Sequence, residues 1–473
     1  MIAAPRAFRT ARLGALLAAA TLAGGCAGSS PREAGPARAT DPAPAASAAA
    51  PPAAATSAEA DRAVSAALSH VSEVRELGPK GPVSSVIISR DELKLRIERD
   101  IIADLEPEVL EGTTELLFAL NLTPADFDYV ASVLQLFGTQ LAGFYDPRAE
   151  EMVLLDDLGV GAQEATLWHE LVHALQDQNY DLERLIKWSP DRGDATAAVL
   201  SLAEGDATSA MLDVMLLPEG KRATDVAEAL IASGMGVIEA LPEVASVPPI
   251  LKRSIVAPYV DGIAFAHALR RRGGWAEVDA AWRDVPTTTE QILHPEKYLA
   301  REPGEILPMP PPPSGGPTVV RFRDTLGEQM VRLVLEDWVP RRTAAEAASG
   351  WAGDRVALFS EGRRRAIAVR LRYDDEPSAE RALEAIARGA FAAELEEPPA
   401  DAEQRREQGL RAARSGAFCR ERARRGPFAA RRRGRDLGVT LGPYERDAKA
   451  TRSVGSCGTA LTWAAAVAEP GKP

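Results

Sequence analysis

The chain has 473 residues, which is too long for one ordinary domain and predicts two or three. Hydrophobic residues make up 46% and charged residues 26%, a balance that favours folded cores over a disordered polymer. The net charge of −13 excludes a generally basic nucleic-acid-binding protein, so no nucleic-acid partner is expected. An arginine-rich run at residues 405–435 is interpreted as a solvated surface.

The first 26 residues have the features of an export signal. Three arginines precede an apolar run from Leu13 to Gly25, which contains no acidic residue and is too short for an ordinary transmembrane helix. The run ends in Leu-Ala-Gly-Gly-Cys26, which resembles a bacterial lipobox, the signal whose cysteine becomes lipid-modified. The alternative is a plain secreted protein cleaved by a general signal peptidase. We therefore expect a lipoprotein anchored at Cys26 in the bacterial cell envelope, in the periplasm or at the outer membrane.

Composition then divides the chain. Residues 27–59 are almost wholly Ala, Pro, Ser and Gly, which predicts a disordered tether that holds a folded body away from a membrane. A first folded region is expected at 60–303, and a Pro/Gly linker at 304–317 separates it from a second at 318–473. No later stretch is long and apolar enough for a transmembrane helix.

The first folded region begins with helical periodicity. Apolar residues at intervals of three and four predict helices at 90–120 and 124–137, the second ending at Gly138. Short strands are expected at 140–145 and 151–155, and the intervening Asp-Pro-Arg favours a hairpin turn. A strong helix should follow from about residue 162 to residue 180.

That helix carries an HExxH motif, formed by His169, Glu170 and His173. The four-residue spacing places both imidazoles on one helix face, so both can reach one Zn²⁺ at ~2.0–2.1 Å. Uncharged flanking residues and Leu175 strengthen the motif. With these residues the chain resembles the zincin metallopeptidases. The string HELVHALQDQ is similar to the gluzincin branch, whose third metal ligand is a glutamate.

Glu204 is the expected third ligand. A break at 188–193 precedes a second helical stretch at 194–216, and a turn in the break would return Glu204 alongside His173 on an antiparallel helix. A carboxylate in this apolar stretch would be costly to bury without a cation. A surface glutamate is the alternative. Asp206 is the competing ligand. We expect it instead to contact one of the ligand side chains, and so orient it, without contacting the metal.

The resemblance implies one zinc ion with water in its fourth position. Glu170 would take a proton from that water and hand it to the leaving amine. Thermolysin-like enzymes have an aspartate four residues after the glutamate, where this chain has Thr208, so the resemblance is to zincins broadly. In zincins an edge strand pairs with the extended substrate, and residues 140–155 are placed in sequence to supply it. The alternative is an ordinary structural hairpin. Further candidates for supporting a ligand or the transition-state oxyanion are Asp177, Asp206, His294, Tyr298 and Tyr259.

His294 and Tyr298 belong to an unusual polar cluster, TTTEQILHPEKY, at residues 287–298. It resembles a segment of bacterial HExxH proteins of this general type. The alternative is a structural use of the cluster, in capping or docking this segment.

The sequence of the second folded region predicts an α+β pattern in which two strand pairs are each followed by a helix. This order suggests an internal duplication. Cys419 and Cys457 both fall in it, and in an exported protein such a pair favours a disulfide. No catalytic constellation is visible, so substrate recognition or attachment to a partner are its default roles. The expected elements are strands at 355–360 and 366–373, a helix at 378–395, strands near 427–442 and a helix near 456–468.

The expected fold is therefore α+β, with a mainly helical zincin-like peptidase domain that carries a small β-hairpin, followed by a smaller α+β domain. The expected function is zinc-dependent hydrolysis of peptide bonds in a peptide or protein substrate. The alternative is a catalytically inactive metal-binding or structural lipoprotein of the envelope. The sequence leaves the oligomeric state open.

Overall fold

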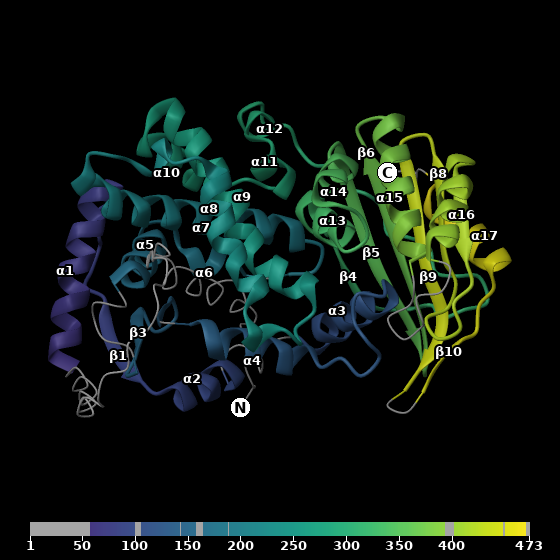
Figure 1. Ribbon diagram of the computed structural model, residues 1–473, viewed down its shortest axis with the longest axis horizontal. Helices are drawn as coiled ribbons and strands as arrows, with labels where there is room; N and C mark the ends of the chain where they lie inside the picture. The colour runs from purple at the N-terminus through teal and green to yellow at the C-terminus, as the bar shows by residue number, and fades with distance from the viewer. Residues whose placement is uncertain are drawn as a thin grey trace, which may run out of the picture.

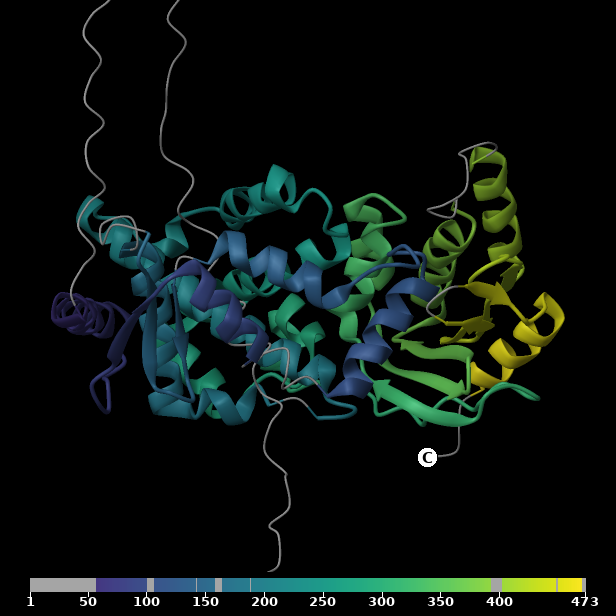
Figure 2. The ribbon, with the colours of Figure 1, turned by 90° about the horizontal axis from the view of Figure 1, so that it is seen from below.

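The computed structural model describes residues 57–99, 106–141, 143–157, 164–187, 189–392, 402–447 and 450–469. The expected signal peptide, Cys26 and most of the tether lie outside these residues. Figures 1 and 2 show a helical lobe beside a lobe built on a large sheet, so the α+β class is confirmed. No helix of the described part of the chain is long and apolar enough to cross a membrane.

The helical lobe begins with α1 (Ser57–Arg75), so the folded body starts before residue 60, inside the expected tether. Its buried residues Ala60, Val64, Leu68 and Val71 recur at intervals of three and four. This apolar stripe packs α1 against the helix that carries the HExxH motif. The N-terminal helix is therefore part of the core of this lobe.

The single helix expected at 90–120 is not continuous. Arg90–Ile97 forms α2, and a proline at the first helical position begins α3 (Pro107–Ala119), where proline is well tolerated. The next helix is α4 (Tyr129–Gln140). Asp128 caps its N-terminus, because its side chain accepts a hydrogen bond from the backbone N–H of Ala131. It passes through Gly138, so the expectation that this glycine ends the helix is wrong.

The expected hairpin is present. Strands β2 (Gly143–Asp146) and β3 (Glu151–Leu155) pair antiparallel, and the side chain of Asp146 accepts a hydrogen bond from Arg148 N in the turn. A strand that the sequence analysis missed, β1 (Ser84–Ile88), pairs parallel with β3. The strand order β1-β3-β2 leaves β2 at an edge of this small sheet.

The helices that carry the expected metal ligands follow. The HExxH helix is α5 (Glu164–Tyr180), and after the short α6 (Leu182–Leu185) the chain enters α7 (Gly193–Leu216). The long α9 (Pro249–Gly273) packs closely along α7. The remaining helices of this lobe are α8 (Glu228–Met235), α10 (Trp275–Arg283), α11 (Thr289–Leu293) and α12 (Pro295–Leu299), with short 3-10 turns between Leu217 and Val244.

The second lobe is an antiparallel seven-stranded sheet of order β4-β5-β6-β9-β8-β7, with β10 paired to β9. The expected strand pairs correspond to β5 with β6 and to β8 with β9, whereas β4, β7 and β10 were missed. The strands are β4 (Val319–Asp324), β5 (Trp351–Glu361), β6 (Arg364–Tyr373), β7 (Ala417–Arg420), β8 (Phe428–Arg433), β9 (Asp436–Arg446) and β10 (Thr451–Ser453). The helices are α13 (Gly327–Glu336), α14 (Arg341–Ala348), α15 (Glu376–Ala390), α16 (Ala402–Arg414) and α17 (Cys457–Val467).

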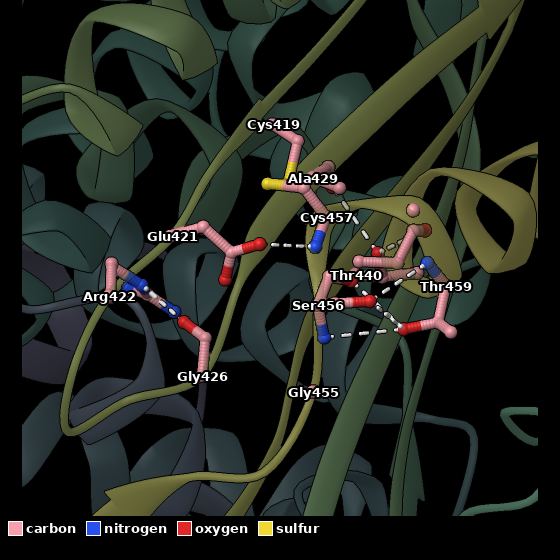
Figure 3. Close-up of a disulfide and its surroundings, with 12 residues drawn as sticks. Cys419, Glu421, Arg422, Gly426, Ala429, Thr440, Gly455, Ser456, Cys457 and Thr459 are labelled. Carbon is pink, nitrogen blue, oxygen red and sulfur yellow. Dashed lines mark hydrogen bonds between the residues drawn. A yellow bond between two sulfur atoms is a disulfide. The ribbon is translucent and has the colours of Figure 1, made fainter.

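Both faces of the central strands of this sheet are buried, and successive residues of a strand alternate between the two faces. In β5, Val356 and Leu358 belong to the main core beneath α13 and α15, whereas Ala357 and Phe359 face α17. Gly438 lets α17 approach, because a Cβ there would lie 2.1 Å from Ala464 O. A disulfide between Cys419 and Cys457, the expected pair, fixes β7 to the first turn of α17 (Figure 3).

The two lobes share one hydrophobic core, because α3 lies against β4 although the two are far apart in sequence (Figures 1 and 2). Arg422 and Arg425 donate to the carbonyl oxygens of Ala119 and Phe118 at the end of α3, where a cation is favoured. Both arginines are buried, so the interpretation of the whole 405–435 run as a solvated surface is wrong at these two positions.

The expected linker at 304–317 has no helix or strand, yet it is packed. The backbone N–H of Glu305 donates to Ala352 O at 2.7 Å, and Leu307 is buried. At its far end, Trp463 of α17 donates from its indole nitrogen to Pro311 O at 2.7 Å. This segment is therefore fixed along the sheet lobe and does not act as a free hinge.

Asp194, in the first turn of α7, is a buried acid at the junction between the lobes. Its carboxylate accepts hydrogen bonds from the backbone N–H and the hydroxyl of Thr289, at 2.9 and 2.6 Å. Burial raises the pKa of Asp194 to about 7. In the folded protein the carboxyl group of Asp194 therefore keeps its proton over a pH range in which the same group in the unfolded chain, with a pKa of about 4, has lost it.

Wild-type stability should consequently fall as pH rises from 5 to 7, through the interval between the two pKa values. The variant Asp194→Asn keeps an oxygen for both Thr289 bonds and has no proton to lose. We expect the wild type to lose about 1–2 kcal/mol relative to this variant between pH 5 and pH 7. Urea unfolding at both pH values measures the difference, and parallel pH profiles of the two proteins would contradict the assignment.

Candidate metal centre

Three buried side chains from two helices meet in the helical lobe. The four-residue spacing of His169 and His173 places both imidazoles on one face of α5, and α7 returns Glu204 to the same point. The Nε2 atom of His169 lies 3.1 Å from Glu204 Oε2, and Nε2 of His173 lies 3.5 Å from that oxygen. The two histidine Nε2 atoms are 3.2 Å apart. These three residues form the ligand cluster.

The dimensions of the ligand cluster fit a zinc ion. Bonds of ~2.0–2.1 Å in tetrahedral geometry put neighbouring ligand atoms roughly 3.3–3.4 Å apart. The three separations of 3.1, 3.2 and 3.5 Å lie around that value. Three protein ligands of this kind would leave one position for a water or a substrate, as in catalytic zinc sites.

The protonation of the cluster also suits a cation. Burial raises the pKa of Glu204, but the neighbouring His173 and His169 outweigh burial and lower it to about 2. Burial lowers the pKa of His173, but Glu204 outweighs burial and raises it to about 9. Burial lowers the pKa of His169. The cluster therefore contains a fixed carboxylate charge that is balanced, without a metal, by a proton on His173.

Glu170 lies beside the cluster and is fully buried. Its Oε2 accepts a hydrogen bond of 2.9 Å from the backbone N–H of Tyr145, in the edge strand β2. Its Oε1 is buried without a hydrogen-bond partner. Burial raises the pKa of Glu170 to about 8. Sequence reasoning missed the contact with Tyr145, because no local pattern connects β2 to α5.

Gln176, which the sequence analysis did not single out, supports His173. Its Nε2 lies 3.0 Å from Ala203 O and 3.1 Å from Asp206 Oδ2, and both of these atoms only accept hydrogen bonds. Its Oε1 therefore faces His173 Nδ1 at 2.8 Å, and Nδ1 must donate. The signal was present in the sequence, since Gln176 follows His173 by three residues on one helix.

The expectation for Asp206 fits this arrangement. Asp206 lies two residues after Glu204 and is not one of the cluster residues. It accepts a hydrogen bond from the amide of Gln176, whose oxygen faces His173. The hydroxyl of Thr208, at the position of the thermolysin-like aspartate, is buried without a hydrogen-bond partner. In this chain the partner of His173 is Gln176, which is bonded in turn to Asp206.

Tyr259, on α9, is the one oxyanion candidate that the structure brings to the cluster. Its ring stacks on His169 with centroids 5.8 Å apart, and Glu204 and Glu170 lie close enough to act on its pKa. Burial, together with Glu204 and Glu170, raises its pKa well above the ordinary value. At neutral pH the phenol is therefore protonated, so its hydroxyl is of the donating kind.

The other candidates are used elsewhere. Asp177 accepts a hydrogen bond of 3.2 Å from the hydroxyl of Tyr145 and so supports the edge strand. The Nε2 of His294 lies 2.9 Å from Glu328 of α13, and Tyr298 donates to Asp284 O at 2.8 Å. These contacts favour the structural use of the segment, since His294 joins it to the sheet lobe and Tyr298 ties it to Asp284 within the helical lobe. Among the described residues, no hydrogen bond or ion pair joins either side chain to the cluster, so their role at an oxyanion stays a prediction.

A second acidic group is not a metal site of the same kind. Glu290, Glu302 and Asp374 lie close together, but the ammonium of Lys297 is 2.7, 2.9 and 2.9 Å from their oxygens. The lysine supplies the positive charge that a metal would bring. Among the described residues, Glu204 forms ion pairs only with His169 and His173 and has no lysine or arginine partner.

Comparison with known proteins adds one finding. A family model described as a domain of unknown function (DUF8575) matches residues 318–452, which begin at the expected start of the second folded region and include β4 to most of β10. The match covers neither the ligand cluster nor α17. No curated protein and no solved structure matches the chain.

Proposed function

We propose that this protein is a zinc-dependent peptidase of the zincin, gluzincin-like type. In this proposal His169, His173 and Glu204 hold one zinc ion, and Glu170 is the catalytic base. The observation that carries the proposal is Glu170 itself. A buried carboxylate with an unpartnered oxygen lies directly beside a three-ligand cluster with zinc dimensions.

A bound zinc ion supplies a Lewis acid that polarises a carbonyl and lowers the pKa of a water molecule. The residues of the chain do the rest. The zinc charge would stabilise the carboxylate form of Glu170, whose pKa is otherwise raised to about 8, chiefly by burial. Oε1 of Glu170 is then ready to accept a proton and to return it to a leaving amine.

The edge strand β2 supports a peptide as the substrate. Strand addition to a sheet edge binds an extended peptide through its backbone, without regard to most side chains. Tyr145 in β2 contacts Glu170 directly, so a peptide lying along this edge would run past the base. In this proposal Tyr259, whose ring stacks on His169, would donate a hydrogen bond to an oxyanion that forms beside the cluster.

The inactive-lipoprotein alternative is less favoured by the same contacts. A structural zinc site normally has four protein ligands and gains nothing from a neighbouring buried acid. An unpaired buried carboxylate oxygen costs stability, and such costs concentrate at functional sites. In the proposed location the protein is anchored to a membrane through a lipid on Cys26. This part of the proposal rests on the sequence of the export signal alone.

The test is metal removal from the soluble body of the chain, residues 57–473. We expect one zinc per protein by elemental analysis, and hydrolysis of an unfolded protein substrate that stops after dialysis against a chelator. Adding back one equivalent of zinc should restore hydrolysis. Magnesium should not, because nitrogen ligands suit zinc and magnesium prefers oxygen. A protein that holds zinc but cleaves none of several unfolded substrates would favour the inactive alternative.

A further inference from the structure

The amide of Gln176 is held by a chain of buried contacts that reaches the N-terminal helix. Asp206 accepts hydrogen bonds from Gln176 Nε2 at 3.1 Å, Arg75 Nε at 2.5 Å and Trp282 Nε1 at 2.8 Å. Arg75 and Asp206 have no exposed surface. Arg75 is the last residue of α1, and its guanidinium lies 4.5 Å from the ring centroid of Trp275.

These contacts leave little freedom at His173. Asp206 fixes which way the amide of Gln176 points, because its carboxylate accepts only from the NH₂ end. The amide oxygen then requires a proton on Nδ1 of His173. The Nε2 lone pair of the neutral imidazole is consequently directed at the ligand cluster, which is the form that binds a metal.

We propose that Arg75, Asp206 and Gln176 act together as a positioning network that sets the tautomer and the ring orientation of His173. The N-terminal helix α1 is thereby a working part of the metal site, although it lies 98 residues before His173. These residues act through the ligand and do not touch substrate. The inference rests on the proposed function only in requiring that the ligand cluster binds zinc.

The structure offers a matched control for Arg75. Arg270, on α9, is also a buried arginine, forms an ion pair with an aspartate of α7 (Asp213), and lies 3.8 Å from the ring centroid of Trp275. It has no contact with Gln176 or Asp206 in the described part of the chain. Loss of either arginine should destabilise the fold, but only loss of Arg75 should act on His173.

The experiment is a zinc titration of metal-free protein against a competing chelator, with a thermal melt of each variant. Gln176→Leu and Arg75→Met should weaken zinc binding roughly 10- to 100-fold, the usual effect of removing the partner of a metal-binding histidine. Arg270→Met and Gln178→Leu should leave affinity within about threefold of wild type. Gln178 lies on the same helix and binds the backbone at Lys80 and Gly81 instead.

The outcomes separate the two proposals. Unchanged affinity in Gln176→Leu, or equal losses in Arg75→Met and Arg270→Met, overturns the network and leaves the peptidase intact. Selective losses in a protein that hydrolyses no peptide support the network and overturn the peptidase. A wild type that binds no zinc overturns both. Gln176→Leu keeps the pair between Arg75 and Asp206, so it still tests whether the network supports His173 even if Arg75→Met does not fold.

Discussion

Replacing Glu170 by glutamine should lower kcat for peptide hydrolysis by roughly 10²- to 10⁴-fold while the protein keeps its zinc. Glutamine has the same shape, and its amide oxygen can still accept the hydrogen bond from the backbone N–H of Tyr145. Its NH₂ group takes the place of Oε1 and cannot accept a proton. The variant therefore removes the base and leaves the architecture of the site in place.

The measurement is kcat on one substrate, with zinc content determined on the same samples. Glu204→Gln is the contrasting variant, because the neutral amide is a poor zinc ligand and the loss should appear in metal content. Glu183→Gln on α6 is the control for a general effect of removing a carboxylate. A Glu170→Gln enzyme that retains full zinc and more than about a tenth of the activity would exclude Glu170 as the base.

Gly205→Ala should destabilise the protein by about 3 kcal/mol or more. At this point α7 and α9 touch through their backbones, since a Cβ on Gly205 would lie 2.0 Å from Gly262 O. A Cβ on Gly262 would likewise lie 1.9 Å from Ser201 O. No side chain can move aside to make room, so the helices must separate. Glu204 adjoins the contact, and zinc affinity should fall with stability.

Urea unfolding of metal-free protein measures the first effect, and zinc titration measures the second. Gly234→Ala is the matched control, because Gly234 is also helical, in α8, and a Cβ there meets nothing within 4 Å. That substitution should be neutral or stabilise by up to about 1 kcal/mol. Equal stability of Gly205→Ala and wild type would show that α7 and α9 do not meet as closely as described.

The parts of the site that depend on local periodicity were predictable from the sequence. The spacing of His169 and His173 fixes their common face, since a helix turns once in 3.6 residues. The hairpin of β2 and β3 followed from a turn signal between two apolar runs. Glu204 was predictable as a candidate, with Asp206 as its competitor, because a carboxylate beside an apolar stretch is costly to bury without a cation. The structure brings Glu204, and not Asp206, to the two histidines.

Other features were decided by tertiary packing, because sequence spacing says nothing about which distant faces meet. Arg75 reaches Asp206 only after α1 packs on α5 and α7, and Tyr259 reaches Glu204 only because two glycines let α9 touch α7. His294 belongs to a conspicuous motif yet pairs with Glu328 of the sheet lobe.

The sequence by itself determined the chemistry of the ligand cluster, since residue type and helical period are local properties. Only the tertiary structure decided what supports His173 and Glu170. The donors that hold Asp206 come from Arg75, Gln176 and Trp282, on three separate helices, and the donor to Glu170 comes from a strand. A buried polar group must find its partner wherever the packing places one, and that location is not written in the neighbouring residues.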